Sequence, residues 1–163
     1  MRSLFAGLFP DMANRYARWV PLLLRLMVGY GFMAHGIAKL ERGADNFTHI
    51  LAALRVPFPA LASWATILVE IFGGAAFLLG ALVTLGSIPA LVVLLVAIVT
   101  VHLPNGFSSI KLQSVDAMGA HFGQPGYETD LLYIVCILAL MMCGAGPWSV
   151  DGWIARRLKK SGS

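Results

Sequence analysis

Four long apolar stretches restrict the folds open to this chain more than any other feature. They cover Val20–Leu40, Leu61–Val83, Leu85–Leu103 and Leu131–Trp148. A helix that crosses a bilayer needs ~20 consecutive, mostly apolar residues, and all these stretches are close to that length. Glu70 is the one charged residue in the second stretch, and the third and fourth contain no Asp, Glu, Lys or Arg. The sequence therefore predicts an all-α polytopic membrane protein, with a four-transmembrane-helix bundle over residues 20–150.

The composition excludes a soluble domain of this size. Of the 163 residues, 58% are hydrophobic and only 12% are charged, so a water-soluble fold would expose too much apolar surface. The formal net charge is +4, and we expect the basic residues behind it to set the membrane topology and to contact anionic lipid headgroups. Basic and aromatic residues are not interleaved as they are in many nucleic-acid-binding segments, so we expect no nucleic-acid partner.

The two ends of the chain are basic and indicate its orientation. Residues 1–19 form an amphipathic leader that we expect to lie on the membrane surface, with a flexible tail as the alternative that Pro10 supports. Residues 151–163 form a basic tail. The basic residues of these two segments are Arg2, Arg15, Arg18, Arg156, Arg157, Lys159 and Lys160. An even number of spans places both ends on one side, and their excess of Lys and Arg predicts that this side is the cytoplasm.

The connections between the spans differ in length. The second link is short, and we expect it to turn at Gly86 and Pro89, which makes the second and third helices antiparallel neighbours. Residues 104–128 are glycine-rich, and a loop this long in a small protein is usually functional or folds back onto the bundle. Within it, Ile110, Leu112 and Val115 are compatible with a short strand-like piece or a re-entrant piece.

Ionisable residues inside the spans are costly in lipid and tend to face the bundle interior or a cavity. With 1.5 Å of rise per residue, His35 lies ~22 Å and His102 ~24 Å above the inner edge of the membrane. Glu70 lies ~14 Å below the outer surface. We therefore expect both histidines to face one cavity in the outer half of the bundle, above Glu70. The candidate catalytic residues are His35, Glu70 and His102.

Each of these residues also has a purely structural interpretation. Glu70 belongs to a stripe of mostly small residues, with Gly73 and Gly74, that predicts close contact with the first span. Arg25 lies ~8 Å above the inner edge and either reaches Glu70 or extends to the headgroups. Lys39, one turn above His35, is expected to extend to the outer surface. His35 could bond a loop and His102 could cap its helix.

Several short motifs occur here in a fixed order. An "HGxxK" ends the first span, "PxP" follows it, and "ExxGG" lies in the second span. A histidine then ends the third span, "GYE" precedes the fourth, and "GAGPWSVDGW" closes it. Over roughly residues 20–153 this pattern resembles the DoxX family of small bacterial membrane proteins. The resemblance implies a four-helix membrane bundle in the bacterial inner membrane, often associated with redox enzymes. The residues that match the family's motifs by position are His35, Gly36, Lys39, Glu70, Gly73, Gly74, His102, Glu128, Gly146, Pro147 and Asp151.

A quinone-linked redox role, as a component or membrane subunit of an oxidoreductase system, agrees best with these features. Histidine exchanges protons near neutral pH, and a quinone needs an apolar slot with proton-exchanging groups. Lys39, Arg25 and Glu128 are the candidate ligand-binding residues, and the electrons would come from a redox partner protein because the sequence contains no evident electron carrier. A membrane anchor or scaffold for a redox or secreted partner is the alternative. Haem or a metal, held by the two histidines, ranks lower because no ligand set is local in sequence. The oligomeric state is open, a homo-oligomer included.

Overall fold

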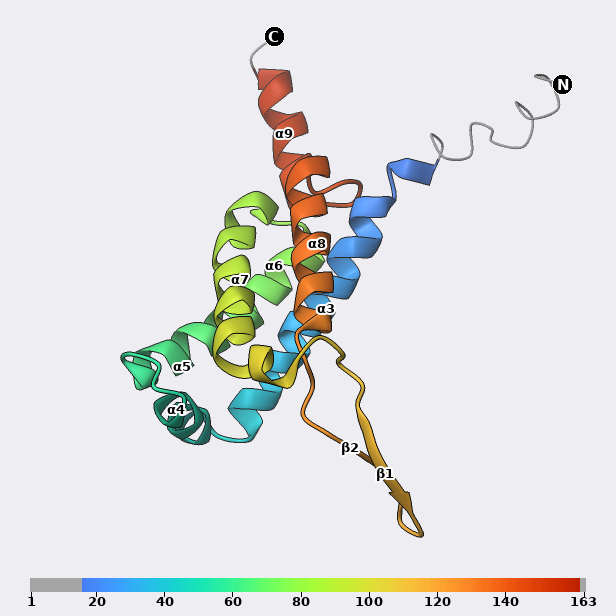
Figure 1. The fold of residues 1–163 in the computed structure, drawn as a ribbon. Helices are drawn as coiled ribbons and strands as arrows, with labels where there is room; N and C mark the ends of the chain where they lie inside the picture. The colour runs from blue at the N-terminus through green and yellow to red at the C-terminus, as the bar shows by residue number, and fades with distance from the viewer. Residues whose placement is uncertain (1–15, 162–163) are drawn as a thin grey trace, which may run out of the picture.

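The computed structural model describes residues 16–161 and is mainly helical (Figure 1). The elements are α3 (Val20–Glu41), α4 (Ala44–Ala53), α5 (Pro59–Leu68), η1 (Val69–Gly73), α6 (Gly74–Leu79), α7 (Val83–Ala97), η2 (Ile98–His102), η3 (Leu103–Asn105), β1 (Leu112–Asp116), β2 (Gly119–Phe122), α8 (Glu128–Cys143) and α9 (Val150–Ser161). Only the last four residues of the leader predicted for residues 1–19 fall inside the described range, so its placement on the membrane surface stays a prediction.

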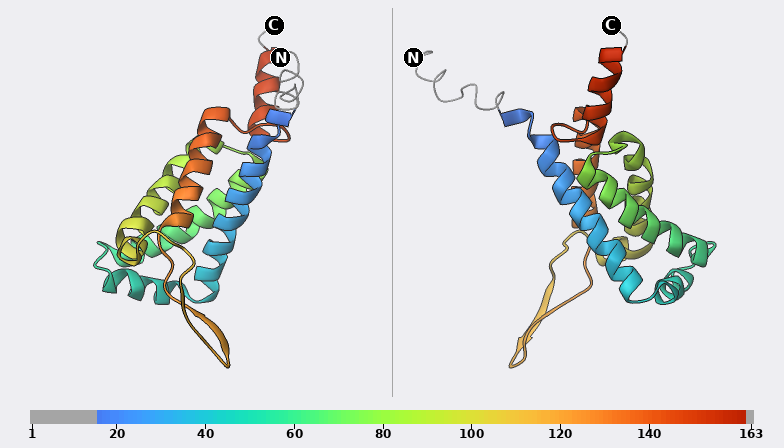
Figure 2. Two further views of the ribbon diagram at one scale, coloured as in Figure 1. Left: turned by 45° about the vertical axis from the view of Figure 1, so that its right-hand side comes forward. Right: turned by 180° about the vertical axis from the view of Figure 1, so that it is seen from behind.

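Three continuous helices are long and apolar enough to cross a membrane, by length and composition: Val20–Glu41, Pro59–Leu79 and Val83–Asn105. The fourth predicted span is shorter than expected, because α8 ends at Cys143 after 16 residues. At 1.5 Å per residue α8 measures ~24 Å, against a hydrocarbon core of ~30 Å. It nevertheless lies beside the other three and completes a four-helix bundle (Figures 1 and 2).

The bundle is arranged around α3. This helix packs on η1 and α6 along one side and on α8 along another, while α7 packs on α8 and η1. The core between them is apolar, with Val28, Phe32, Phe77, Ile137 and Leu140 all 3% exposed or less. Large apolar side chains cover the outside, as a lipid environment allows. Leu23 and Val99, for example, are 65% and 66% exposed.

Glycines bring α3 and the second span into backbone contact. A Cβ atom on Gly29 would lie 2.7 Å from the carbonyl oxygen of Gly74, and one on Gly36 would lie 2.9 Å from the Cβ of Glu70. The predicted small-residue contact is therefore present at Gly74 and Glu70. Gly73 is the exception, because a Cβ there would meet nothing within 4 Å.

The turn between the second and third spans lies earlier than the sequence suggested. Gly80 ends α6 with φ of 64°, and α7 begins at Val83. Gly86 and Pro89, the expected turn residues, both lie inside α7. The Asp151 carboxylate accepts hydrogen bonds from the backbone N–H groups of Leu82 and Val83 at 2.7 and 2.9 Å. A helix can start there because this distant carboxylate takes the place of a local capping residue.

The two ends of the bundle carry different structures. The start of α3 and all of α9 lie at one end, while α4 and a β-hairpin lie at the other (Figures 1 and 2). This arrangement agrees with both termini on one side of the membrane; that this side is cytoplasmic stays a prediction. The helix α4 falls in residues 41–60, for which the sequence predicted no element.

Of the two conformations left open for residues 104–128, the structure has the strand. Strands β1 and β2 form an antiparallel hairpin that projects away from the bundle (Figure 1). At its tip the carboxylate of Asp116 lies 2.9 Å from Nε2 of His121, and this hydrogen bond lowers the pKa of Asp116 from its usual value. Leu112, Val115 and Phe122 remain 59–69% exposed on the hairpin.

Candidate functional site

A cavity of about 240 Å³ opens between the four helices in the half of the bundle nearest the hairpin. Its polar lining consists of His35, Lys39, Glu70, His102, Thr129, Asp130 and Tyr133. The remaining lining is Phe32, Val93, Leu94, Ala97, Pro125 and Gly126. All three candidate catalytic residues thus line one cavity, as their predicted depths suggested, although no catalytic role follows from this position alone.

Lys39 and Glu70 form an ion pair across the cavity wall. Nζ of Lys39 lies 2.6 Å from each carboxylate oxygen of Glu70. Glu70 is 7% exposed, so its charge would be costly without this partner. The contact depends on Gly36, which allows η1 to approach α3 closely. Nζ of Lys39 also lies 5.3 Å from the centre of the Phe47 ring on α4. The expected extension of Lys39 to the outer surface is therefore wrong.

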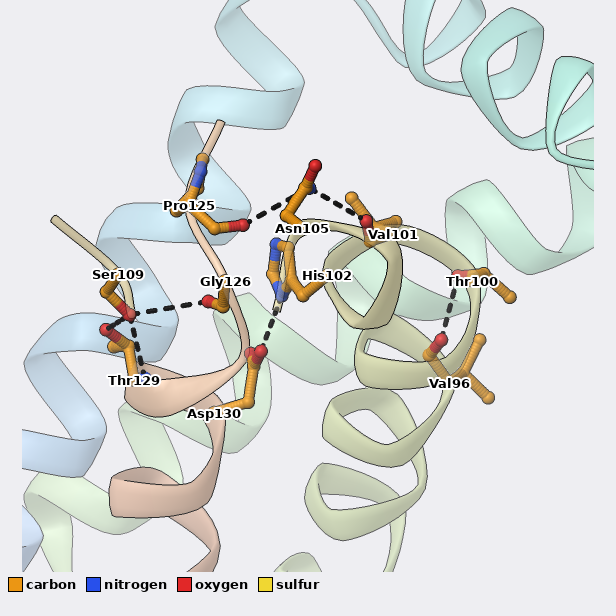
Figure 3. Close-up of polar contacts among 10 residues, drawn as sticks. All are labelled: Val96, Thr100, Val101, His102, Asn105, Ser109, Pro125, Gly126, Thr129 and Asp130. Atoms are coloured by element: carbon orange, nitrogen blue, oxygen red, sulfur yellow. Dashed lines mark hydrogen bonds and ion pairs between the residues drawn. The ribbon is translucent and has the colours of Figure 1, made fainter. Parts of the chain in front are cut away.

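His102 and Asp130 form a second side-chain pair (Figure 3). Nδ1 of His102 lies 2.5 Å from a carboxylate oxygen of Asp130, which is itself only 7% exposed. The side-chain amide of Asn105 donates to the carbonyl oxygens of Val101 and Pro125 at 3.2 and 3.3 Å, and this joins the end of the third span to the loop between β2 and α8 (Figure 3). Nδ1 of the imidazole is thus oriented by Asp130, and its other ring nitrogen has no protein hydrogen bond among the described residues.

His35 is a polar group of the site without a hydrogen-bond partner among the described residues. Its imidazole remains exposed at the cavity. An imidazole that faces a cavity and has no protein partner is available to a ligand or to water. The cavity therefore combines an ion pair, a histidine–carboxylate pair and a free imidazole with apolar walls. Such a set can hold a small ligand by hydrogen bonds and exchange protons with it.

Comparison with known proteins places this architecture in a family. The sequence model of the DoxX family matches residues 20–103, which is more than half of the chain. The chain belongs to the DoxX family. It is also 28% identical over 152 residues to the uncharacterized membrane protein Rv3486 of Mycobacterium tuberculosis, a match that covers 87% of this chain and 85% of the relative. No solved structure shows significant similarity.

Arg25 lies outside the cavity of this DoxX protein. It is fully buried near the opposite end of α3, where its Nη2 donates to the carbonyl oxygens of Pro147 and Trp148 at 2.9 and 3.2 Å. The alternative in which Arg25 reaches Glu70 is wrong, because Glu70 pairs with Lys39. Arg25 instead fastens the first span to the closing "GAGPWS" segment, and its predicted role in ligand binding gains no support from this position.

Glu128 also lies outside the cavity lining. Its carboxylate accepts a hydrogen bond from the backbone N–H of Ser109 at 3.0 Å. The Ser109 hydroxyl in turn lies 2.8 Å from that of Thr129, as Figure 3 shows. Glu128 therefore holds the base of the hairpin against the start of α8, next to the lining residue Thr129. It positions the lining residue Thr129 without touching the space a ligand would fill.

Three polar residues of the cavity lining were not among the predicted site residues: Thr129, Asp130 and Tyr133. An available signal was the spacing of Asp130 and Tyr133, which places both on one face of a helix. The helix irregularities could not be foreseen: Glu70 lies in the π-helical segment η1, and His102 ends the π-helical segment η2. Such segments are frequent at functional sites.

Proposed function

We propose that the outer cavity binds the headgroup of a membrane quinone, and that the protein serves as a quinone-linked component of an oxidoreductase system. One observation carries the proposal: His35, the Lys39–Glu70 pair and the His102–Asp130 pair converge on one apolar-walled cavity in a membrane protein. A quinone ring is flat and apolar, with a carbonyl acceptor at each end. Apolar walls with a few convergent polar groups are the usual character of a site for such a ligand.

The size of the cavity supports a headgroup rather than a larger cofactor. Sites for drug-sized ligands measure ~300–1,000 Å³, and this one measures about 240 Å³. Phe32 and Tyr133, whose ring centres lie 5.8 Å apart, provide aromatic surface beside it. A single ring is of a size that suits this volume, and the polar lining would supply hydrogen bonds to its carbonyl oxygens.

Reduction of a quinone to the quinol consumes two electrons and two protons. The protons would pass through His35 and through His102, whose Nδ1 lies beside the Asp130 carboxylate. The electrons would come from a redox partner protein at the membrane of a bacterial cell. Among the described residues, no group of three or more His, Cys, Asp or Glu is arranged to hold a metal ion.

The test is to quantify quinone that copurifies with the protein. Wild-type protein purified in mild detergent should contain quinone at about one molecule per chain after washing, and His35→Ala should contain far less. His49 lies exposed on α4, outside the cavity lining, so His49→Ala is the matched control and should equal the wild type. A wild-type preparation without bound quinone, or equal amounts in wild type and His35→Ala, would exclude this cavity as the quinone site.

The same preparation tests for haem and for a metal, the two lower-ranked cofactors. Haem would give a Soret band and a metal would be found by elemental analysis. A cavity of about 240 Å³ is too small for a haem macrocycle, so its walls would have to move apart.

A scaffold role has one specific observation in its favour. The β-hairpin projects from the bundle with exposed apolar side chains, which is unusual for a segment facing water. A scaffold would bind a redox or secreted protein through this hairpin and would purify without quinone. The quinone-linked role instead predicts that quinone binding remains intact when residues 112–122 are replaced by a glycine–serine linker.

A further inference from the structure

A second hollow lies on the lipid-facing side of the bundle, at the seam between the second-span helices and α7. It measures about 390 Å³, and every residue that lines it is apolar or glycine. Its rim is made by large apolar side chains that are well exposed, such as Phe72 at 67% and Leu85 at 62%. This seam groove is therefore open to the hydrocarbon interior of the bilayer.

Two glycines keep the seam groove open. Gly73 of η1 and Gly86 of α7 both line it, and a Cβ atom on either would meet nothing within 4 Å. Neither has a positive φ, and glycine within a helix costs ~1 kcal/mol relative to alanine. Gly29 and Gly74 differ, because a Cβ on either would collide with neighbouring backbone at 2.7 Å. Neither backbone conformation nor contact within the described chain thus requires glycine at these two positions, and both leave the groove free of larger side chains.

The seam groove adjoins the polar cavity on both helices that form it. On the second span, Glu70 lines the cavity and Val69, next to it in sequence, lines the groove. On α7, Val93 lines the cavity and Pro89, four residues earlier, lines the groove. Residues four apart in an α-helix are neighbours on one helix face. The polar cavity and the apolar groove thus lie next to each other along the seam between the second span and α7.

From this arrangement we infer that the ligand of the cavity is an amphiphile whose hydrocarbon chain lies in the seam groove. The inference rests on the proposed function and narrows it: the ligand is a quinone with a long apolar tail, such as an isoprenoid chain, and not a water-soluble quinone. A polar cavity that adjoins an apolar groove matches a molecule with a polar ring and an attached chain. A helix from a second copy of the protein is the competing occupant, and the experiment below distinguishes it.

The experiment compares two forms of one benzoquinone that carry either a decyl chain or only a methyl group at the same ring position. Binding is measured to protein in lipid nanodiscs, with affinities corrected for partition of each probe into lipid. Gly86→Leu fills the groove, and Gly86→Ala is the matched control because its Cβ meets open space. Thr84→Leu adds apolar bulk at an exposed position of α7 outside the groove and the cavity.

Wild type, Gly86→Ala and Thr84→Leu should bind the decyl form about tenfold more tightly than the methyl form, a difference of 1.4 kcal/mol. Gly86→Leu should lose this preference while its affinity for the methyl form is unchanged. If Gly86→Leu keeps the preference, the chain does not lie in the seam groove, although the proposed function stands. If neither probe binds to the wild type, both the proposed function and this inference fail. If the wild type is a dimer that Gly86→Leu dissociates, with no change in chain preference, the occupant is a second copy.

Discussion

At the scale of single residues, the ion pair between Lys39 and Glu70 is the contact on which the cavity depends most. Glu70 is nearly buried, and its two carboxylate oxygens both lie 2.6 Å from Nζ of Lys39. In the hydrocarbon region no water replaces a lost partner, so the cost of an unpaired carboxylate falls on the folded state. The pair therefore links the first and second spans at the level where a ligand would bind.

Removing one member of this pair should cost more than removing both charges. Lys39→Met leaves the Glu70 carboxylate without its cation, and we expect a loss of about 2 kcal/mol. This lies below the ~3–5 kcal/mol of a fully buried pair because the Lys39 side chain is 25% exposed. The double variant Lys39→Met with Glu70→Gln should recover part of the loss. Unfolding in mixed micelles measures the free energy of unfolding of the two single variants and of the double variant. If the double variant loses as much stability as Lys39→Met and Glu70→Gln lose together, the ion pair contributes nothing to stability.

At the scale of elements, the contact between α3 and the second span is set by glycines on both helices. Gly29, Gly36 and Gly74 each leave no room for a Cβ atom, whereas Gly73, next in sequence to Gly74, has free space. Of these two neighbouring glycines, Gly74 therefore packs against α3, whereas a side chain at Gly73 would meet open space.

Replacing Gly74 by alanine should destabilise the bundle, because the new Cβ would lie 2.7 Å from the backbone nitrogen of Met33. Overpacking of this kind costs about 1–3 kcal/mol. Gly73→Ala is the matched control and should be neutral or slightly stabilising, since alanine favours the helix and meets open space. Thermal unfolding in detergent measures the difference. Equal melting temperatures for the two variants would contradict the close approach of α3 and α6.

The elements also show what the sequence could and could not predict. Apolar length predicted four membrane helices, of which three have the full length in the structure. Helical depth brought His35 and His102 to one level above Glu70, and all three line one cavity. Both predictions depend only on local periodicity. The partners of charged residues depend on tertiary contacts instead. Arg25 bonds carbonyl groups more than 120 residues away, and Asp151 caps α7 from 68 residues away. Hydropathy contains no information about such pairs, which is why the Arg25–Glu70 alternative and the turn at Gly86 were wrong.

At the scale of the whole molecule, the start of α3 and the basic helix α9 lie at one end, while the cavity and hairpin lie towards the other. We predict that the first end is cytoplasmic, because Lys and Arg concentrate there. A reporter that folds only in the cytoplasm should be active when fused after Ser163, and a reporter that requires export should be inactive there. An active exported reporter at that position would reverse the orientation and move the cavity to the cytoplasmic half.

The central claim is that one cavity, between the four helices, receives the quinone ring. Photolabelling with an azido-quinone, followed by mass-spectrometric mapping of the labelled residues, tests it most directly. The label should fall on cavity-lining residues such as Phe32 and Tyr133, and excess unlabelled quinone should suppress it. Labelling that is spread over lipid-facing residues such as Leu23 and Val99, and that unlabelled quinone does not suppress, would contradict the claim.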